Sequence, residues 1–371
     1  MNSSGETLEV FSLLTAGGIA KLTRYRQAGV TTRLAGGFFA LSVLIIAAVL
    51  TSLSLGPVPI PAAEVASILL AHLGFDLADF GRTEQLVVEQ IRLPRILVGA
   101  MVGMALGVSG ATMQGLFRNP MADPGIIGVS AGGAVGAVVA IATGAAGLFF
   151  IALPTFAFVG AIMASLLVYG IAAFGGRFSM ATLLLAGVAV NAFLGAVVSA
   201  IIILVPDNGA LREILFWLAG GLESRSWEHF RIATPLILGA TVFIVLMSRD
   251  LNLLMLGDDE ARSMGVRVGI TRLTLLGAAA LATGAAVAVS GTIAFVGLVT
   301  PHILRLMLGP DHRVLIPMSA LGGAVFVILA DTVARTVVQP AEFPVGVLTA
   351  FVGAPFFIFL LINNRRRVHS L

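Results

Sequence analysis

Long apolar stretches separated by short polar segments dominate the chain. Ten such stretches fall near residues 34–55, 93–116, 126–148, 151–174, 181–205, 232–248, 273–289, 292–308, 315–337 and 344–362. Most have about 20 residues, the length that a helix needs to cross a hydrocarbon core of roughly 30 Å. None shows the period-two alternation of a membrane β-barrel. The pattern therefore predicts an all-α polytopic membrane protein with ten transmembrane helices.

The region 273–304 decides this count of helices. It carries no ionisable residue before His302. One helix through it would be roughly 48 Å long, well beyond the thickness of the hydrocarbon core. Both ends of the chain are basic, at residues 21–33 and 365–367, so the positive-inside rule places both in the cytoplasm. That placement requires an even number of spans, and we expect a break near Ser290-Gly291.

This topology divides the chain into a cytoplasmic N-terminal arm, residues 1–33, and a single ten-helix membrane domain, residues 34–364. It leaves fifteen of the 22 basic residues on the cytoplasmic side, in line with the positive-inside rule. Two outer segments, 56–92 and 206–231, are long enough to fold. Only one inner loop is long, residues 249–272.

Composition narrows the class of protein further. Of the 371 residues, 58% are hydrophobic and 11% charged, with a mean hydropathy of +1.03, whereas soluble domains carry roughly 25% charged residues. The sole lysine, Lys21, follows Ala20, so the chain lacks the Gly-Lys pair of a phosphate-binding loop. Without cysteine, or histidines at metal-ligand spacing, we expect no metal site. These features predict a transport subunit and not an enzyme, and they imply that any ATP is bound by another polypeptide.

A weak internal repeat accompanies the spans. Val108-Ser109-Gly110 recurs as Val289-Ser290-Gly291, at an offset of 181 residues that also brings Pro120 onto Pro301. The first copy lies on a span that enters the cell and the second on a span that leaves it. Such an arrangement is typical of the inverted repeats of transporters.

Glycines recur every four residues in two of the spans, at 99, 103 and 107 and again at 128, 132 and 136. This spacing puts the glycines on one helix face, where a neighbouring backbone can approach closely. We interpret both sets as helix-packing surfaces.

Two motifs flank the second span, Gln90-Ile91-Arg92-Leu93-Pro94-Arg95 before it and Gly115 to Gly125 after it. Together with their spacing they resemble the membrane subunit of ABC importers for iron chelates and vitamin B12, the FecCD-like type II importers, and most closely the bacterial heme permeases. The resemblance covers residues 34–364. It implies a type II permease fold of ten helices in the bacterial inner (cytoplasmic) membrane, with both termini in the cytoplasm. It also implies a homodimer in the lipid bilayer, two ABC ATPase subunits and a periplasmic substrate-binding protein; nothing suggests a nucleic-acid partner.

The resemblance assigns binding-protein docking to arginines at the outer surface. In the family, the matching arginines receive glutamates from the binding protein, which points to Arg92 and Arg335, with Arg95 as a weaker candidate. Read without the family, Arg92 and Arg335 are boundary residues whose side chains snorkel to the interface. Arg335 also follows Asp331 by four residues, so an intrahelical pair is an alternative.

The inner loop resembles the segment through which these permeases couple to the ATPase, Gly-x-x-x-Ala-Arg-x-x-Gly. The residues assigned to coupling are Gly257, Asp258, Glu260, Ala261, Arg262 and Gly265. The acidic start suits a helix N-terminus. An ordinary solvated turn is the alternative interpretation.

The inner gate of the family matches the start of the fifth span, at Ser179, Met180 and Ala181, and Met113 is assigned to the translocation path. Family members often carry small hydroxyl residues where this chain has Met180 and Ala181, so its gate chemistry differs.

The expected cargo is heme, with a ferric siderophore or, less favoured, vitamin B12 as alternatives. No permanently bound cofactor is expected; heme or another iron chelate is the transported substrate, and ATP binds the partner subunit. A rival of another class is an ion-coupled secondary transporter that would rely on Asp331, the only acidic residue well inside a span. A permease for bare zinc or manganese would instead need clustered histidines and aspartates, which the sequence does not show.

Overall fold

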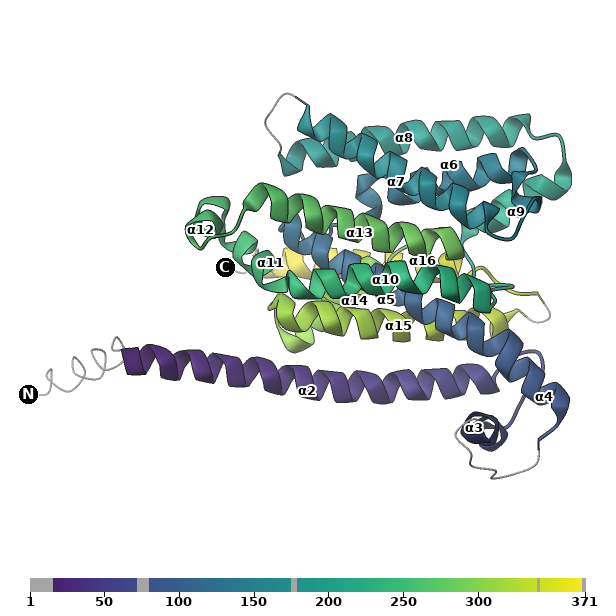
Figure 1. Cartoon of the computed structure of the whole chain (residues 1–371), viewed down its shortest axis with the longest axis horizontal. Coiled ribbons are helices and arrows are strands. Elements are labelled where there is room, and N and C mark those ends of the chain that lie inside the picture. The colour runs from purple at the N-terminus through teal and green to yellow at the C-terminus, as the bar shows by residue number, and fades with distance from the viewer. Residues whose placement is uncertain (1–15, 72–79, 175–178, 339–340, 369–371) are drawn as a thin grey trace, which may run out of the picture.

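The computed structural model describes residues 16–71, 80–174, 179–338 and 341–368, and within them every regular element is a helix. Ten helices correspond to the predicted spans: α2 (Ala16–Ser54), α5 (Leu93–Leu116), α6 (Val129–Ala142), α7 (Ala152–Ala173), α8 (Met180–Leu204), α10 (Trp227–Leu246), α13 (Val268–Ser290), α14 (Val296–Leu308), α15 (His312–Val337) and α16 (Val345–Val368). They run side by side in Figure 1, and seven of the described helices are long and apolar enough to cross a membrane. The all-helical membrane fold predicted from the sequence is confirmed.

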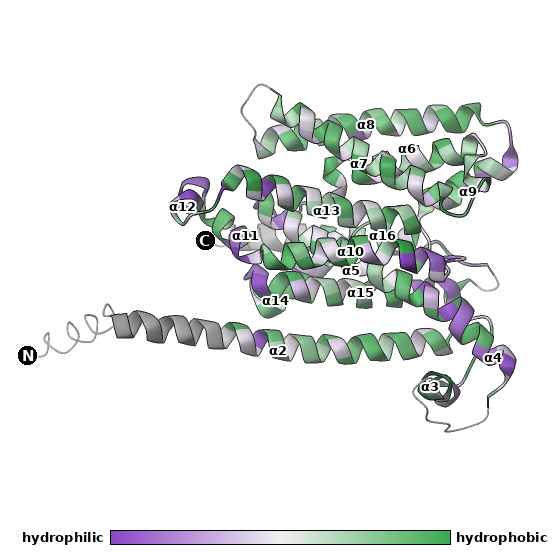
Figure 2. Cartoon of the chain, viewed as in Figure 1, coloured by the Kyte–Doolittle hydropathy of each residue, from purple (hydrophilic) through white to green (hydrophobic). Residues whose placement is uncertain are grey.

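Short helices fill the segments at the two ends of the bundle. They are α3 (Ala62–Ala71), α4 (Arg82–Leu86), the π-helix η1 (Val87–Arg92), the 3₁₀ turns η2 (Pro124–Ile127) and η3 (Ala145–Gly147), α9 (Asn208–Ala219), α11 (Ser248–Leu256) and α12 (Asp258–Ser263). Figure 2 shows that hydrophilic residues gather around α4 at one end and around α11 and α12 at the other, with apolar helices between them. The first turns of α2 and the last turns of α16 lie at the end that carries α12 (Figure 1), as the even number of spans requires.

The break predicted in region 273–304 is present, because α13 ends at Ser290 and α14 begins at Val296. At 1.5 Å per residue, α14 is only about 20 Å long, which is shorter than a hydrocarbon core of about 30 Å. The irregular segment before α14 must therefore cover part of the membrane thickness. Irregular backbone is tolerated at that depth only where protein satisfies its polar groups. Here the Gly221 N–H donates to the Ser290 carbonyl at 2.8 Å, and the Thr292 hydroxyl donates to the Leu218 carbonyl.

Two helix starts differ from the sequence prediction. The described part of the arm, residues 16–33, is helical and continuous with the first span, so position 33 marks a change in hydropathy and not in secondary structure. The second span begins earlier too, because α4, η1 and α5 form one continuous helix from Arg82 to Leu116. The π-helical turn stands just before Pro94, which has no N–H for a regular helical bond.

Helices α5, α13 and α15 form the centre of the bundle, and glycine permits their closest crossing. A Cβ atom built on Gly103 of α5 would lie 2.1 Å from the backbone oxygen of Gly323 of α15, and the reverse distance is also 2.1 Å. Gly132 of α6 meets Gly160 of α7 in the same way, at 2.3 Å. Both glycine patterns are therefore helix-packing surfaces, as their spacing predicted.

Helices α5 and α13 carry the two copies of the repeated Val-Ser-Gly motif, with Gly291 at the C-cap of α13. Helix α5 packs against α15, and its counterpart α13 packs against α7, while α5 and α13 run in opposite directions and contact each other (Figure 1). Gly103 faces α15, and the residue 181 positions later, Gly284, faces Ala161 and Phe158 of α7. Gly284 meets only side chains, at 3.5–3.6 Å, and has no close backbone crossing like that of Gly103, so the inverted repeat stays a prediction.

Candidate functional site

The three arginines expected at the outer surface are buried inside the chain: Arg92 is 4% exposed, Arg95 8% and Arg335 3%. They lie at the end of the bundle opposite α12, where the last turn of α2 crosses the ends of α5 and α15. The expectation of snorkelling boundary residues is therefore wrong. We call Arg92, Arg95, Arg225 and Arg335, with Asp331 and Glu342, the outer arginine cluster.

The C-terminal turn of α2 explains the burial of two of these arginines. Its last four carbonyl groups have no partner within the helix. Backbone N–H groups of Leu55 and Ile60 donate to two of them. The Arg335 guanidinium donates to the carbonyl of Ser52, with a further bond of 2.6 Å to its hydroxyl, and Arg92 donates to the carbonyl of Leu53. The arginines thus complete a helix end that would otherwise leave buried carbonyls unpaired.

Arg95 holds the two acidic residues of the cluster. Its Nε and Nη2 donate to the Asp331 carboxylate at 2.8–3.1 Å, and its Nη1 donates to Glu342 at 2.7 Å. The predicted pair between Asp331 and Arg335 is present but longer, at 3.8 Å. Asp331 is 1% exposed and fully engaged by arginine, so it does not present a free carboxylate to a transported ion.

Arg225 adds a fourth positive charge beside this network, and the sequence analysis did not single it out. It lies in the turn between α9 and α10 and contacts the His229 ring at 3.1 Å. Burial and the nearby charge of Arg95, partly offset by Glu223, together lower the pKa of Arg225 to about 10. Arg95 and Arg225 line a cavity of about 320 Å³ together with three glutamates, Glu213, Glu223 and Glu342. A hollow lined by charges of both signs therefore lies next to the cluster.

The predicted coupling segment folds as a short peg, α12, that stands out from the opposite end of the bundle (Figure 1). Gly257 allows the sharp turn before it, because its φ of +141° is a backbone conformation that other residues rarely adopt. After the peg, Gly265 at φ +86° ends the helix: its N–H donates to the Arg262 carbonyl, and the Val266 N–H donates to that of Ala261. Both motif glycines therefore shape the peg.

Two members of the motif face the protein and anchor the peg. Asp258 accepts bonds of 2.5 and 2.8 Å from Arg272 of α13 and lies 3.3 Å from Arg118, which also donates to the Leu254 carbonyl. Ala261 is fully buried. These two residues were assigned to the contact with a partner, but the peg needs them to hold its own position.

The other face of the peg is free. The side chains of Asp259 and Arg262 are 92% and 60% exposed and pair with each other at 2.7 Å, while Glu260 is exposed between them. The peg is thus rigid at its base and charged at its tip, an arrangement suited to a protein partner.

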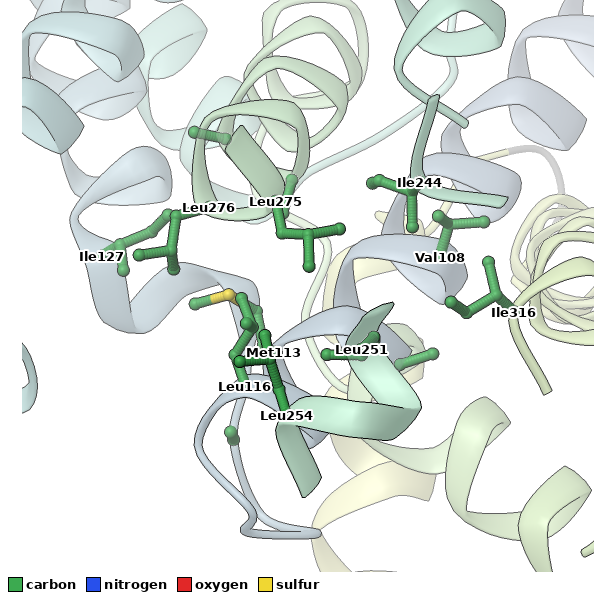
Figure 3. Close-up of a cluster of buried hydrophobic side chains, with 14 of the residues drawn as sticks. Val108, Met113, Leu116, Ile127, Ile244, Leu251, Leu254, Leu275, Leu276 and Ile316 are labelled. Carbon is green, nitrogen blue, oxygen red and sulfur yellow. The ribbon is translucent and has the colours of Figure 1, made fainter. Parts of the chain in front are cut away.

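The predicted gate residues do not form one group. Ser179 caps α8 by accepting the Thr182 N–H at 3.0 Å, Met180 packs partly against the core, and Ala181 is exposed. Met113 is fully buried among Leu116 and other core side chains (Figure 3), so in this chain it does not face an open path. Its assignment to the path is corrected to a core position.

A polar contact near the peg end was missed. Arg305 of α14 donates to Gln114 of α5 at 2.6 Å, next to the buried helical residue Gly115. A glutamine inside an otherwise apolar helix was the available signal, because intramembrane polar groups rarely lack a partner. Among the described residues, no three His, Asp or Glu side chains lie close enough together to hold a metal ion.

Comparison with known proteins assigns the chain to a protein family. The model of the FecCD transport family matches residues 44–363. The chain belongs to the FecCD transport family. It is 42% identical over 361 residues to the cobalamin import system permease protein BtuC of Halobacterium salinarum, covering 88% of this chain and 96% of that protein. It is 45% identical over 280 residues to the hemin transport system permease protein HmuU of Yersinia pestis, covering 75% and 83%.

The fold of this FecCD permease also matches a solved structure, described as an inward-facing conformation of a metal-chelate type ABC transporter. The TM-score is 0.77 at 32% identity, and the match covers 88% of this permease and 98% of that chain. The family resemblance drawn from the motifs around Arg92 and Pro120 is confirmed, and with it the identity of the chain as an ABC importer permease.

Proposed function

We propose that this permease carries heme from a periplasmic binding protein into the cytoplasm by alternating access, as a homodimer with two ATPase subunits. The similarity to a hemin permease, 45% identical over three quarters of the chain, carries the choice of cargo. The absence of a phosphate-binding loop in the full sequence fits a subunit whose ATP is bound elsewhere.

A second cargo, cobalamin, is favoured by the relative from Halobacterium salinarum, which matches over a longer part of the chain. Heme and cobalamin are both large metal chelates built on a macrocycle. The FecCD permease is therefore proposed to conduct a bulky chelate, and the experiment below separates the two.

The test of cargo uses the permease reconstituted with its ATPase subunits and binding protein. ATP hydrolysis is measured with the binding protein loaded with heme, with cobalamin or with a ferric siderophore. The proposal expects heme to stimulate hydrolysis most and to enter the vesicles. Stimulation by cobalamin alone would support the second cargo, and stimulation by none of the three would refute both.

The outer arginine cluster is proposed to receive acidic side chains of the binding protein. Its four arginines face the carboxylates of Asp331 and Glu342 and the neighbouring Glu223, so an excess positive charge remains although each of the three predicted arginines is buried. An unbalanced charge that is shielded from water gains more from an acidic partner than an exposed one does. The docking role thus rests on charge, and not on exposure.

The docking test must separate affinity from folding, because Arg92 also pairs with backbone carbonyls. Arg92→Gln is compared with Arg231→Gln, which removes an exposed arginine of the same end outside the cluster. For folded Arg92→Gln, we expect binding-protein affinity to fall roughly 30-fold or more, and its salt dependence to weaken. Unchanged affinity in a variant with a normal elution profile would refute the docking role.

The peg is proposed to dock into the ATPase subunit with its exposed face, Asp259, Glu260 and Arg262. Replacing Glu260 and Arg262 by alanine leaves the anchor at Asp258 intact and removes the charged tip. We expect ATP hydrolysis that no longer depends on loaded binding protein, with uptake lost. An unchanged ratio of cargo imported to ATP hydrolysed would exclude the coupling role. The control is Arg313→Gln, which removes an exposed arginine outside the peg.

A further inference from the structure

The peg end of the bundle holds a cavity beside Gly265 whose charged side chains have no part in the docking or coupling proposals. It has a volume of about 440 Å³, within the range of roughly 300–1,000 Å³ that is typical of sites for small molecules. It lies between the last turn of α10, helix α11 and the first turns of α13. The polar side of its lining carries Arg249, Asp250 and Arg267. The apolar side is formed by Phe243, Met247 and Ile270.

The two arginines of this cavity are unengaged. Both are exposed, and neither guanidinium forms a hydrogen bond or ion pair with any residue that the structure describes. The neighbouring Arg262 and Arg272 are each paired with an aspartate of the peg. Asp250 also lines the cavity, so the polar side carries one net positive charge. A singly charged anion would balance it.

The apolar side continues out of the cavity onto an exposed apolar surface of α10 and α13. On α10, Val242 is 56% exposed and Leu246 75%, and on α13, Ile270 is 53% and Leu273 44% exposed. In Figure 2, the hydropathy changes from apolar to hydrophilic where these helices meet α11 and α12. The cavity therefore lies at the boundary between the apolar belt and the polar end, where phospholipid head groups lie.

We propose that this cavity binds the phosphate of an anionic phospholipid from the leaflet on the peg side, with an acyl chain along α10 and α13. Guanidinium groups bind phosphate through paired N–H donors. A phosphodiester carries one negative charge, which matches the net charge left by Arg249, Arg267 and Asp250. Basic pockets between helices on the cytoplasmic side are suited to anionic lipid heads. The site does not depend on which chelate is carried.

The experiment counts lipids on the purified permease–ATPase complex. The complex is placed in nanodiscs of phosphatidylcholine with one fifth phosphatidylglycerol, released from them, and analysed by native mass spectrometry. Each arginine near the membrane surface contributes roughly five-fold to the affinity for an anionic lipid, so Arg249→Gln with Arg267→Gln should lower phosphatidylglycerol retention about 25-fold at this site. Wild type should retain one more phosphatidylglycerol per permease chain than this double variant.

The matched control is Arg231→Gln with Arg313→Gln, which removes two exposed arginines outside the cavity and changes the net charge equally. It should retain phosphatidylglycerol as wild type does. Equal retention by wild type and the Arg249/Arg267 double variant would overturn the proposal. Displacement of the lipid by millimolar inorganic phosphate would overturn its lipid origin. Loss of the ATPase subunit from the double variant, with lipid retention unchanged, would assign the two arginines to the ATPase contact instead.

Discussion

Asp331 is the buried acidic residue whose replacement best separates a structural role from a direct role in transport. As an ion-coupling carboxylate it would have to release its partner during transport. In this permease it accepts three close contacts from Arg95, at 2.8–3.1 Å, lies 3.8 Å from Arg335, and is 1% exposed. We therefore predict that Asp331→Asn acts mainly on stability.

The magnitude follows from what remains after the charge is removed. Taking one partner from a buried ion pair costs about 3–5 kcal/mol, because the other charge is left uncompensated. Glu342 stays 2.7 Å from Arg95, and the asparagine oxygen can still accept one bond, so the loss should lie near about 3 kcal/mol. Asp259→Asn, which breaks the exposed pair with Arg262, should cost no more than about 1 kcal/mol.

A double-mutant cycle tests the cause. Arg95→Gln and Asp331→Asn are measured singly and together, by the free energy of unfolding of the purified permease in mixed micelles. Because the two residues contact each other, the double variant should lose less stability than the sum of the single variants. Additive losses would refute the paired-charge reasoning, and a fully stable Asp331→Asn that has lost uptake would show that the carboxylate takes part directly in transport.

Two further outcomes are expected. Gly103→Ala should lower the free energy of unfolding by about 1–3 kcal/mol, because its Cβ atom would lie 2.1 Å from the Gly323 oxygen. The control Gly239→Ala should not destabilise the permease, because its Cβ atom would meet nothing within 4 Å. Equal melting temperatures for the two variants would contradict this prediction. Burial raises the pKa of Asp123 in the folded state, and the hydrogen bond from the Gly125 N–H partly offsets this rise. The free energy of unfolding therefore falls as pH rises from the unfolded-state pKa of about 4 to the higher folded-state pKa. Asp123→Asn should therefore be more stable than wild type at pH 7 and equal to it near pH 4, as thermal unfolding at both pH values will show.

The number of helices was predictable because it depends on lengths and charges that the sequence displays directly. An apolar region too long for one span and two basic ends forced a break, and it falls at Ser290. The start of the first helix was not predictable in this way. Hydropathy marks where lipid begins, after Arg33, but a helix that extends into water keeps the same backbone bonds, and α2 begins at Ala16.

The site was predictable in its residues and not in its contacts. The motifs located Arg92 and Arg335, but their carbonyl partners are 39 and 283 residues away, at the end of a helix whose exact last turn hydropathy does not define. The inward turn of Asp258 depends on Arg272, on the next helix. A short sequence motif shows which residues the chain shares with a family. Whether the side chains of those residues are buried depends on distant helix ends whose carbonyl groups accept their hydrogen bonds.

The two ends of the permease therefore use charge differently, and this difference governs how variants should behave. At the outer end, arginines such as Arg92 complete helix ends, and their excess charge is shielded from water, so folding and docking depend on the same side chains. At the peg, stability depends on Asp258, while the exposed Arg262 is free to contact a partner. Variants of the outer cluster should lose stability and docking together, and variants of the peg tip should lose coupling alone.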